Sequence, residues 1–156
     1  MRPRLLADEN TSRRLVSAGR QIEAGFPIIH ISDWKSGAYL SVKDPALLMA
    51  LREAGMIPVG FDRASIPMHA GSLTREGLGH AGVILFRRTV SAVAYGRQAR
   101  LLVDLWREAV DCDWSDRIEY LLSPQAQPES EPRPASHASK PARLPGVAPA
   151  QKAGRD

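Results

Sequence analysis

The chain has 156 residues, of which 44% are hydrophobic and 24% charged, and its formal net charge is +4. This length and composition indicate one soluble globular domain. No apolar run approaches the roughly 18 residues that a membrane span needs, and the apolar run near Met1 is too short for a signal peptide. The single cysteine, Cys112, excludes an internal disulfide, which fits a reducing compartment. We therefore expect a cytoplasmic protein without a membrane segment.

The distribution of proline divides the chain into two parts. Seven of the 12 prolines lie in residues 124–156, where Leu144 and Val147 are the only large apolar side chains. Such a segment cannot bury enough apolar surface to offset the conformational entropy that ordering would cost. We predict one folded domain over residues 1–123 and a disordered Pro/Ala-rich tail over residues 124–156.

Hydrophobic periodicity predicts the elements of the folded part in chain order. Short apolar runs predict strands at 4–7, 26–31, 56–61 and 81–86, and the alternation at 118–122 hints at an edge strand, though a short helix fits nearly as well. Apolar side chains at helical spacing predict helices over 11–24, 44–54 and 90–110, the last with Val93 facing inward. Residues 63–80 show no periodicity and are rich in Gly, Ser and Thr, which predicts a long surface loop.

This order of elements predicts the fold class. Strands that alternate with helices specify an α/β fold of three layers, with a mainly parallel sheet of four to five strands and helices on both faces. In such sheets, ligands bind outside the carboxyl ends of the strands. The residues that follow each strand are therefore the first candidates for a functional site.

Acidic side chains collect at that edge. Asp8 follows the first strand and Asp62 the third, and Asp44 begins the second helix, with Pro45 behind it in the usual arrangement of an N-cap. Converging carboxylates repel one another, and oxygen ligands of this kind suit Mg²⁺ or Mn²⁺. A metal held in this way supports phosphoryl transfer. Helix capping is the alternative interpretation of Asp8 and Asp44, whereas Asp62 has no predicted helix directly behind it.

Basic and neutral side chains near the same edge give weaker signals. Two arginine pairs are candidates for binding substrate phosphate, namely Arg13 and Arg14 at the start of the first helix and Arg87 and Arg88 after the fourth strand. Exposed charged pairs without a function are the ordinary alternative. The four histidines have no metal-ligand spacing, although the two that bracket the predicted loop, His69 and His80, could approach a substrate.

Four segments together resemble a known family. They are LLADEN at 5–10, DPALL at 44–48, VGFDR at 59–63 and HAGVI at 80–84. In this order and spacing they resemble the compact bacterial PIN-like proteins, relatives of the VapC-type ribonuclease toxins, over about residues 4–110. The resemblance implies a PIN-like fold, Mg²⁺ or Mn²⁺, cleavage of single-stranded RNA, and a small antitoxin protein as partner. It matches Asp8, Asp44 and Asp62 with the acidic positions of the family.

The chain also departs from that pattern. The family commonly has Thr or Ser where this chain has Gly60, and a further Asp where it has Ala64. A further acidic residue that larger PIN nucleases carry on a middle helix has no evident counterpart. A thinner acidic set should bind metal more weakly.

Three functions follow as hypotheses. The first is a metal-dependent ribonuclease, a phosphodiester hydrolase that acts as the toxin of a toxin–antitoxin pair. The second is a catalytically degenerate PIN-like module that binds RNA or protein. The third, a phosphorylation-switch receiver domain, needs a lysine after its last strand, and no lysine occurs between Lys43 and Lys140. The sequence leaves a homodimer open.

Overall fold

The domain is built on one five-stranded parallel sheet. The computed structural model describes residues 2–121, so the end of the predicted domain and the predicted tail at 124–156 lie outside the described residues. Five strands pair in the order β2-β1-β3-β4-β5, and every pair is parallel. The strands are β1 (Arg4–Ala7), β2 (Ile28–His30), β3 (Met56–Gly60), β4 (Val83–Phe86) and β5 (Ile118–Leu121).

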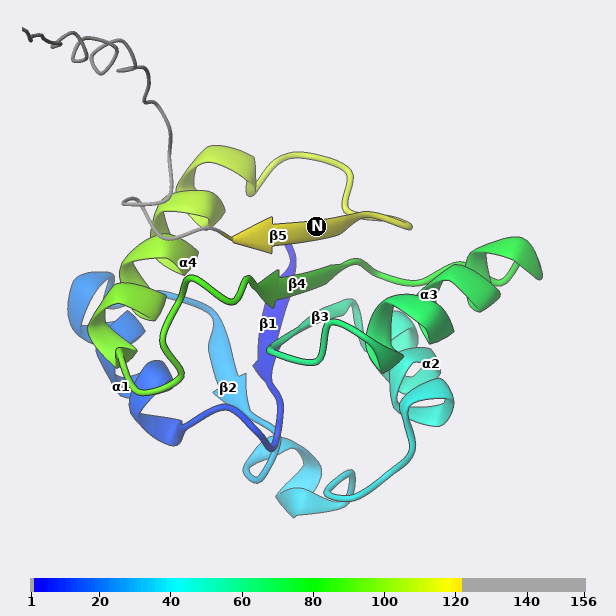
Figure 1. The fold of residues 1–156 in the computed structure, drawn as a ribbon, viewed down its shortest axis with the longest axis horizontal. Helices are drawn as coiled ribbons and strands as arrows, with labels where there is room; N and C mark the ends of the chain where they lie inside the picture. Colours follow the sequence, from blue (N-terminus) through cyan, green and yellow to red (C-terminus); the bar gives the residue numbers. More distant parts are fainter. Residues whose placement is uncertain (1, 122–156) are drawn as a thin grey trace, which may run out of the picture. The chain divides into compact units, whose positions relative to one another are not determined.

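Helices cover both faces of this sheet (Figure 1). On one face, α1 (Arg13–Ile22) packs against α4 (Tyr95–Ala109), and on the other α2 (Asp44–Ala54) packs against α3 (Ser65–Arg75). A short 3₁₀ helix, η1 (Trp34–Gly37), lies between β2 and α2. The three-layer α/β architecture with a parallel sheet, predicted from the order of elements, is confirmed. Within the described residues, no helix is long and apolar enough to cross a bilayer.

Both faces of the strands are buried, as covered parallel sheets require. Successive side chains of a strand point to opposite faces. In β1, Leu5 and Ala7 join the core beneath α1 and α4, whereas Leu6 joins the core beneath α2. This alternation explains why the strands read as continuous apolar runs in the sequence.

The last crossover differs in hand from the other three. From β1 to β2 the chain moves one way along the sheet with α1 on one face, and from β4 to β5 it moves the opposite way with α4 on that same face. The two crossovers therefore have opposite hands. The crossovers through α2 and α3 lie on the other face and share the hand of the first, so β4-α4-β5 alone among the four has the opposite hand.

The predicted loop at 63–80 is wrong, because α3 occupies residues 65–75. Its buried side chains, Ile66, Ala70 and Leu73, recur at helical spacing and pack against β4 and β5. Pro67 lies in the first turn, where a helix has no use for a backbone amide. Proline, a mid-helix glycine and several hydroxyl side chains dilute this stripe, which is why the sequence pattern missed it.

The other boundaries shift by a few residues. The helix predicted over 90–110 begins at Tyr95, and Val93, predicted to face inward, is 72% exposed. The predicted strand at 26–31 contracts to β2, and the predicted edge strand at 118–122 is confirmed as β5. Gly55 ends α2 in the left-handed conformation (φ 67°), which a residue without a side chain adopts at little cost.

Candidate functional site

The three acidic residues selected from the sequence line one small cavity at the carboxyl edge of the sheet. Asp8 follows β1, Asp62 follows β3, and Asp44 is the first residue of α2. The cavity has a volume of about 70 Å³, and its described lining includes Glu9 but no lysine or arginine. Such a volume suits an ion with a few waters and is far below the roughly 300 Å³ of a small-molecule pocket.

Asp8 is the most deeply buried of the three carboxyl groups. Its Oδ1 accepts hydrogen bonds from the backbone amide of Asn10 (3.0 Å) and from the hydroxyl of Thr11 (2.8 Å). Burial raises the pKa of Asp8 above its ordinary value, the negative charge of Asp62 adds to that rise, and the two hydrogen bonds oppose it. The carboxyl group is therefore oriented by its neighbours while its ionised form is disfavoured.

Asp44 does not act as the N-cap that the sequence predicted. The helix α2 begins at Asp44 itself, Lys43 occupies the N-cap position, and no side chain makes a capping hydrogen bond there. Burial raises the pKa of Asp44, and the charge of Asp62 raises it further, while His69 of α3 opposes the rise. The interpretation of Asp44 as a structural cap is therefore wrong, and His69 lies close enough to act on this carboxylate.

Asp62 has the structural role that the sequence did not assign to it. Its Oδ1 accepts hydrogen bonds from the backbone amides of Ala64 (3.0 Å) and Ser65 (2.8 Å), at the start of α3. Burial alone raises the pKa of Asp62, but the hydrogen bonds from Ser65 and Ala64 outweigh that effect, and the pKa is lowered overall. Asp62 thus remains charged at neutral pH and repels the carboxylates of Asp8 and Asp44.

The arrangement concentrates negative charge without a complete set of metal ligands. Within residues 2–121, no group of three or more His, Cys, Asp or Glu side chains is arranged to hold a metal ion. The three carboxylates share a cavity but do not form a ready coordination shell. Small side-chain movements or bound waters, which Mg²⁺ commonly retains, would have to complete the coordination shell.

The predicted phosphate-binding arginines differ in how far they are engaged. Arg13 donates to the hydroxyl of Ser32 (2.7 Å) and forms an ion pair with Asp33 (2.9 Å), so this guanidinium already has two partners. Arg87 and Arg88 are exposed just beyond β4, as is Arg14 at the start of α1. The guanidinium of Arg14 lies 5.8 Å from the ring centroid of Tyr95, and that of Arg87 lies 4.9 Å from the ring centroid of Tyr120.

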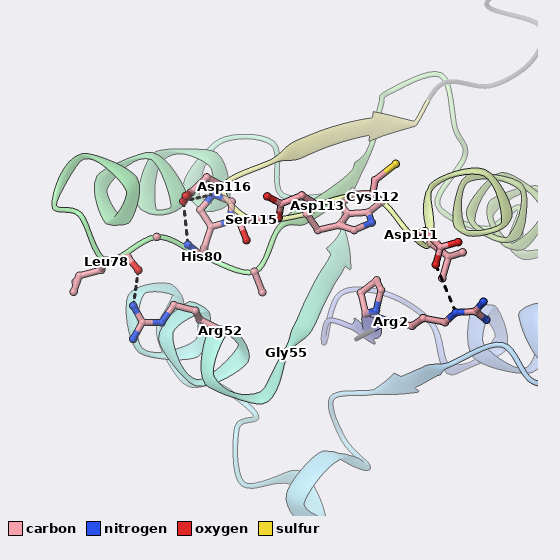
Figure 2. A pocket seen from close by; sticks show the side chains of 15 residues that line it. Arg2, Arg52, Gly55, Leu78, His80, Asp111, Cys112, Asp113, Ser115 and Asp116 are labelled. Carbon is pink, nitrogen blue, oxygen red and sulfur yellow. Dashed lines mark hydrogen bonds and ion pairs between the residues drawn. The ribbon is translucent and has the colours of Figure 1, made fainter.

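A larger hollow lies at the opposite, amino edge of the sheet (Figure 2). Its volume is about 720 Å³, and several of its charged groups already have partners. Arg2 lies 3.8 Å from Asp111, and Asp116 accepts hydrogen bonds from the hydroxyl of Thr74 (2.7 Å) and the amide of His80 (3.1 Å). Because ligands of parallel sheets bind at the carboxyl edge, we favour the smaller cavity.

His80 lines the amino-edge hollow and not the acidic cavity. Burial lowers the pKa of His80, and the nearby charge of Asp116 opposes that effect. The sequence grouped His69 and His80 as residues that bracket the predicted loop, but α3 carries them to opposite edges of the sheet.

Comparison with protein-family models, with characterised proteins and with solved structures finds no match to this chain. The resemblance to PIN-like proteins therefore stays a prediction.

Proposed function

We propose that this protein is a ribonuclease that uses Mg²⁺ or Mn²⁺ to cleave single-stranded RNA. The observation that carries the proposal is the meeting of Asp8, Asp44 and Asp62 on one small cavity whose described lining contains no lysine or arginine. Bringing half-buried, mutually repelling carboxylates together destabilises a fold, and a divalent cation is the simplest compensation. Their elements come from three separate parts of the chain, so local sequence alone does not explain why the three meet.

Each carboxylate has a distinct part in the proposed site. Asp8 and Asp62 follow β1 and β3, which pair directly, so they are best placed to hold the ion. Asp44, which caps nothing, would complete the shell or orient a bound water. A bound divalent cation would supply activation of water and neutralisation of the leaving oxygen. The pKa values of Asp8 and Asp44 are raised, so their ionised forms are disfavoured, and a bound cation would stabilise these ionised forms.

The substrate would lie across the edge of the sheet and not within the cavity, because about 70 Å³ cannot contain a nucleotide. Arg14, Arg87 and Arg88 are exposed near this edge and would hold the phosphates on either side of the scissile bond. Phosphate contacts fix the register of a nucleic acid without reading its sequence. Arg13 fits this part less well, since Ser32 and Asp33 occupy its guanidinium.

The biological setting that we propose is a toxin–antitoxin pair, with a small antitoxin protein as the partner. This part of the proposal rests on the resemblance to VapC-type toxins. Co-expression with the protein of the adjacent reading frame tests it: we expect a complex that survives purification and in which RNA cleavage is suppressed.

A second function, a PIN-like module that binds RNA or protein without cleaving it, is favoured by one observation. The described residues contain no group of three ligating side chains arranged around a metal ion. The departures at Gly60 and Ala64 point the same way.

Cleavage assays separate the two functions. Purified protein free of any partner is incubated with a panel of structured and unstructured RNAs and Mn²⁺, with and without EDTA. If the protein is a ribonuclease, we expect slow cleavage of the single-stranded RNAs. EDTA, Asp8→Asn and Asp62→Asn should each abolish this cleavage. Intact RNA in every sample, together with RNA binding that is independent of metal, would establish the binding module instead.

A further inference from the structure

A chain of hydrogen bonds runs from Arg13 through Ser32, His30 and Thr11 to the carboxyl group of Asp8. His30 is the last residue of β2 and is only 7% exposed, and Thr11, in the turn between β1 and α1, is 3% exposed. Neither residue belongs to the proposed metal site, and apolar packing does not explain why polar side chains are buried at these two positions. The buried polar atoms are used in a connected series.

The direction of each hydrogen bond follows from which groups can donate. Arg13 only donates, so the Ser32 hydroxyl accepts from it (2.7 Å) and gives its own proton to Nδ1 of His30 (2.8 Å). The backbone amide of Ser32 also points at Nδ1 (3.2 Å), which makes that nitrogen an acceptor. The ring proton therefore lies on Nε2, which donates to the carbonyl oxygen of Thr11 (2.7 Å).

Thr11 transmits this constraint to Asp8. Its hydroxyl proton goes to Asp8 Oδ1 at 2.8 Å in preference to the carbonyl of Val59 at 3.4 Å. Its backbone amide donates to the carbonyl oxygen of Asp8 (3.0 Å). Thr11 is thus held at its carbonyl by His30 and fixes Asp8 at both the main chain and the side chain.

We propose that His30 is a positioning residue that sets the orientation of the Asp8 carboxylate through Thr11. The value of this orientation for metal binding rests on the proposed function, but the positioning itself does not. Groups that orient metal ligands from outside the coordination shell commonly change metal affinity by 10-fold or more when removed. His30 would act in this way from β2, one strand away from Asp8.

Three variants of the full chain test the proposal. His30→Leu removes both ring nitrogens, and His30→Gln restores a donor that can reach the Thr11 carbonyl. His80→Leu is the matched control, because His80 is also a buried histidine whose Nδ1 accepts a backbone amide, that of Gly82 (3.1 Å), but it lies at the opposite edge. Calorimetric titration with Mn²⁺ gives the metal affinity. Amide hydrogen exchange at Asn10 and Thr11 gives the order of the turn without any metal.

We expect His30→Leu to weaken Mn²⁺ binding about 10-fold and to speed exchange at Asn10 and Thr11 far more than in the core strands. His30→Gln should keep Mn²⁺ affinity and exchange close to those of the parent protein. His80→Leu should leave Mn²⁺ affinity unchanged and should speed exchange at Asn10 and Thr11 no more than in the core strands. Exchange at Asn10 and Thr11 that rises no more than in the strands would overturn the proposal, because it would show a general loss of stability. If the parent protein binds no Mn²⁺, the proposed function fails, and the exchange measurement still decides the role of His30.

Discussion

Gly60 ends β3 directly against the carboxyl group of Asp8. A Cβ atom built at position 60 would overlap Asp8 Oδ2 and lie 2.7 Å from Asp8 Cγ. The Asp8 carboxylate cannot move aside freely, because Asn10 and Thr11 hold its other oxygen. The glycine at this position, a departure from the resembled family, is therefore coupled to the orientation of the first acidic residue.

The first prediction concerns this contact. We expect Gly60→Ala to lower the free energy of unfolding by about 1–3 kcal/mol, as overpacking of a buried site does. In an Asp8→Ala background the same change should cost much less, because the overlapping carboxyl group is gone. Denaturant unfolding of the four proteins of this cycle measures the coupling. Gly96→Ala in α4 is the control, since nothing lies within 4 Å of a Cβ there, and it should be neutral or stabilising. Equal costs in both backgrounds would contradict the contact.

The second prediction separates capping from metal binding at Asp62. Asp62→Ala removes the acceptor at the start of α3 and should cost about 1 kcal/mol, whereas Asp62→Asn should retain most of that stability because Asn caps as well as Asp. Asp44→Ala should cost little, since Asp44 makes no capping hydrogen bond. Thermal unfolding in EDTA compares the three variants. A larger loss for Asp44→Ala than for Asp62→Ala would contradict the structural role that we assign to Asp62.

The three acidic residues show how much of the site the sequence could predict. Asp8 and Asp62 could be placed together because parallel strands carry the residues that follow them to one edge. The structural role of Asp62 could not, because it depends on α3, whose apolar stripe of Ile66, Ala70 and Leu73 is interrupted by proline and glycine. Asp44 is not a cap because α2 begins one residue earlier than the sequence pattern indicates, and sequence patterns do not resolve a helix start to one residue.

Other parts of the site depend on contacts between distant segments. The pairing of Arg13 with Ser32 and Asp33 joins α1 to the segment after β2, and nothing in the local sequence around Arg13 indicates it. The contact of Gly60 with Asp8 is of the same kind. The sheet and its three layers were predictable because most strands are short apolar runs and most helices carry an apolar stripe, whereas these pairings exist only after the layers assemble.

The third prediction concerns pH. Because burial raises the folded-state pKa of Asp8, its ionisation costs stability, and that cost develops as the pH rises from the ordinary value of 3.8 through the raised value. Asp8→Asn should therefore gain stability relative to the parent as the pH rises through this range, and the gain should level off at neutral pH. Denaturant unfolding in EDTA from pH 3.5 to 7 measures the difference. A difference that shrinks with rising pH would contradict the direction of the shift.

Asp62 should behave with the opposite sign. Its pKa is lowered in the folded protein, so it contributes stability above the ordinary value of 3.8, and that contribution is lost as the pH falls through the folded pKa. Asp62→Asn should therefore lose stability relative to the parent at neutral pH and approach it at the acidic end of the same series. A relative loss that grows toward acidic pH would exclude this sign.

The fourth prediction concerns the metal. A cation that binds only the native state raises the melting temperature by mass action, so millimolar Mn²⁺ should stabilise the parent. Asp8→Asn and Asp62→Asn should each reduce that rise. Asp113→Asn should leave it unchanged, because Asp113 is an exposed carboxylate on the hollow at the opposite edge. Calorimetric melting with and without Mn²⁺ makes the comparison. An identical rise in Asp8→Asn and in the parent would place the metal elsewhere.

The last prediction concerns how RNA is held at the edge of the sheet. Arg87 and Arg88 lie exposed beyond β4, and if they bind phosphates, each alanine variant should weaken binding of single-stranded RNA by a similar factor for every sequence. Each lost phosphate contact should also reduce the slope of the logarithm of affinity against the logarithm of salt concentration by about 0.7.

Arg75→Ala is the control for this measurement, because Arg75 ends α3 and donates to Ser72 of its own helix. Fluorescence anisotropy in EDTA, with RNAs of different sequence over a range of salt, measures affinity without cleavage. Equal salt slopes in the parent, Arg87→Ala and Arg88→Ala would show that the RNA does not cross the β4 end of the sheet. The substrate would then have to approach the acidic cavity from the side of α1, where Arg14 lies beside Tyr95.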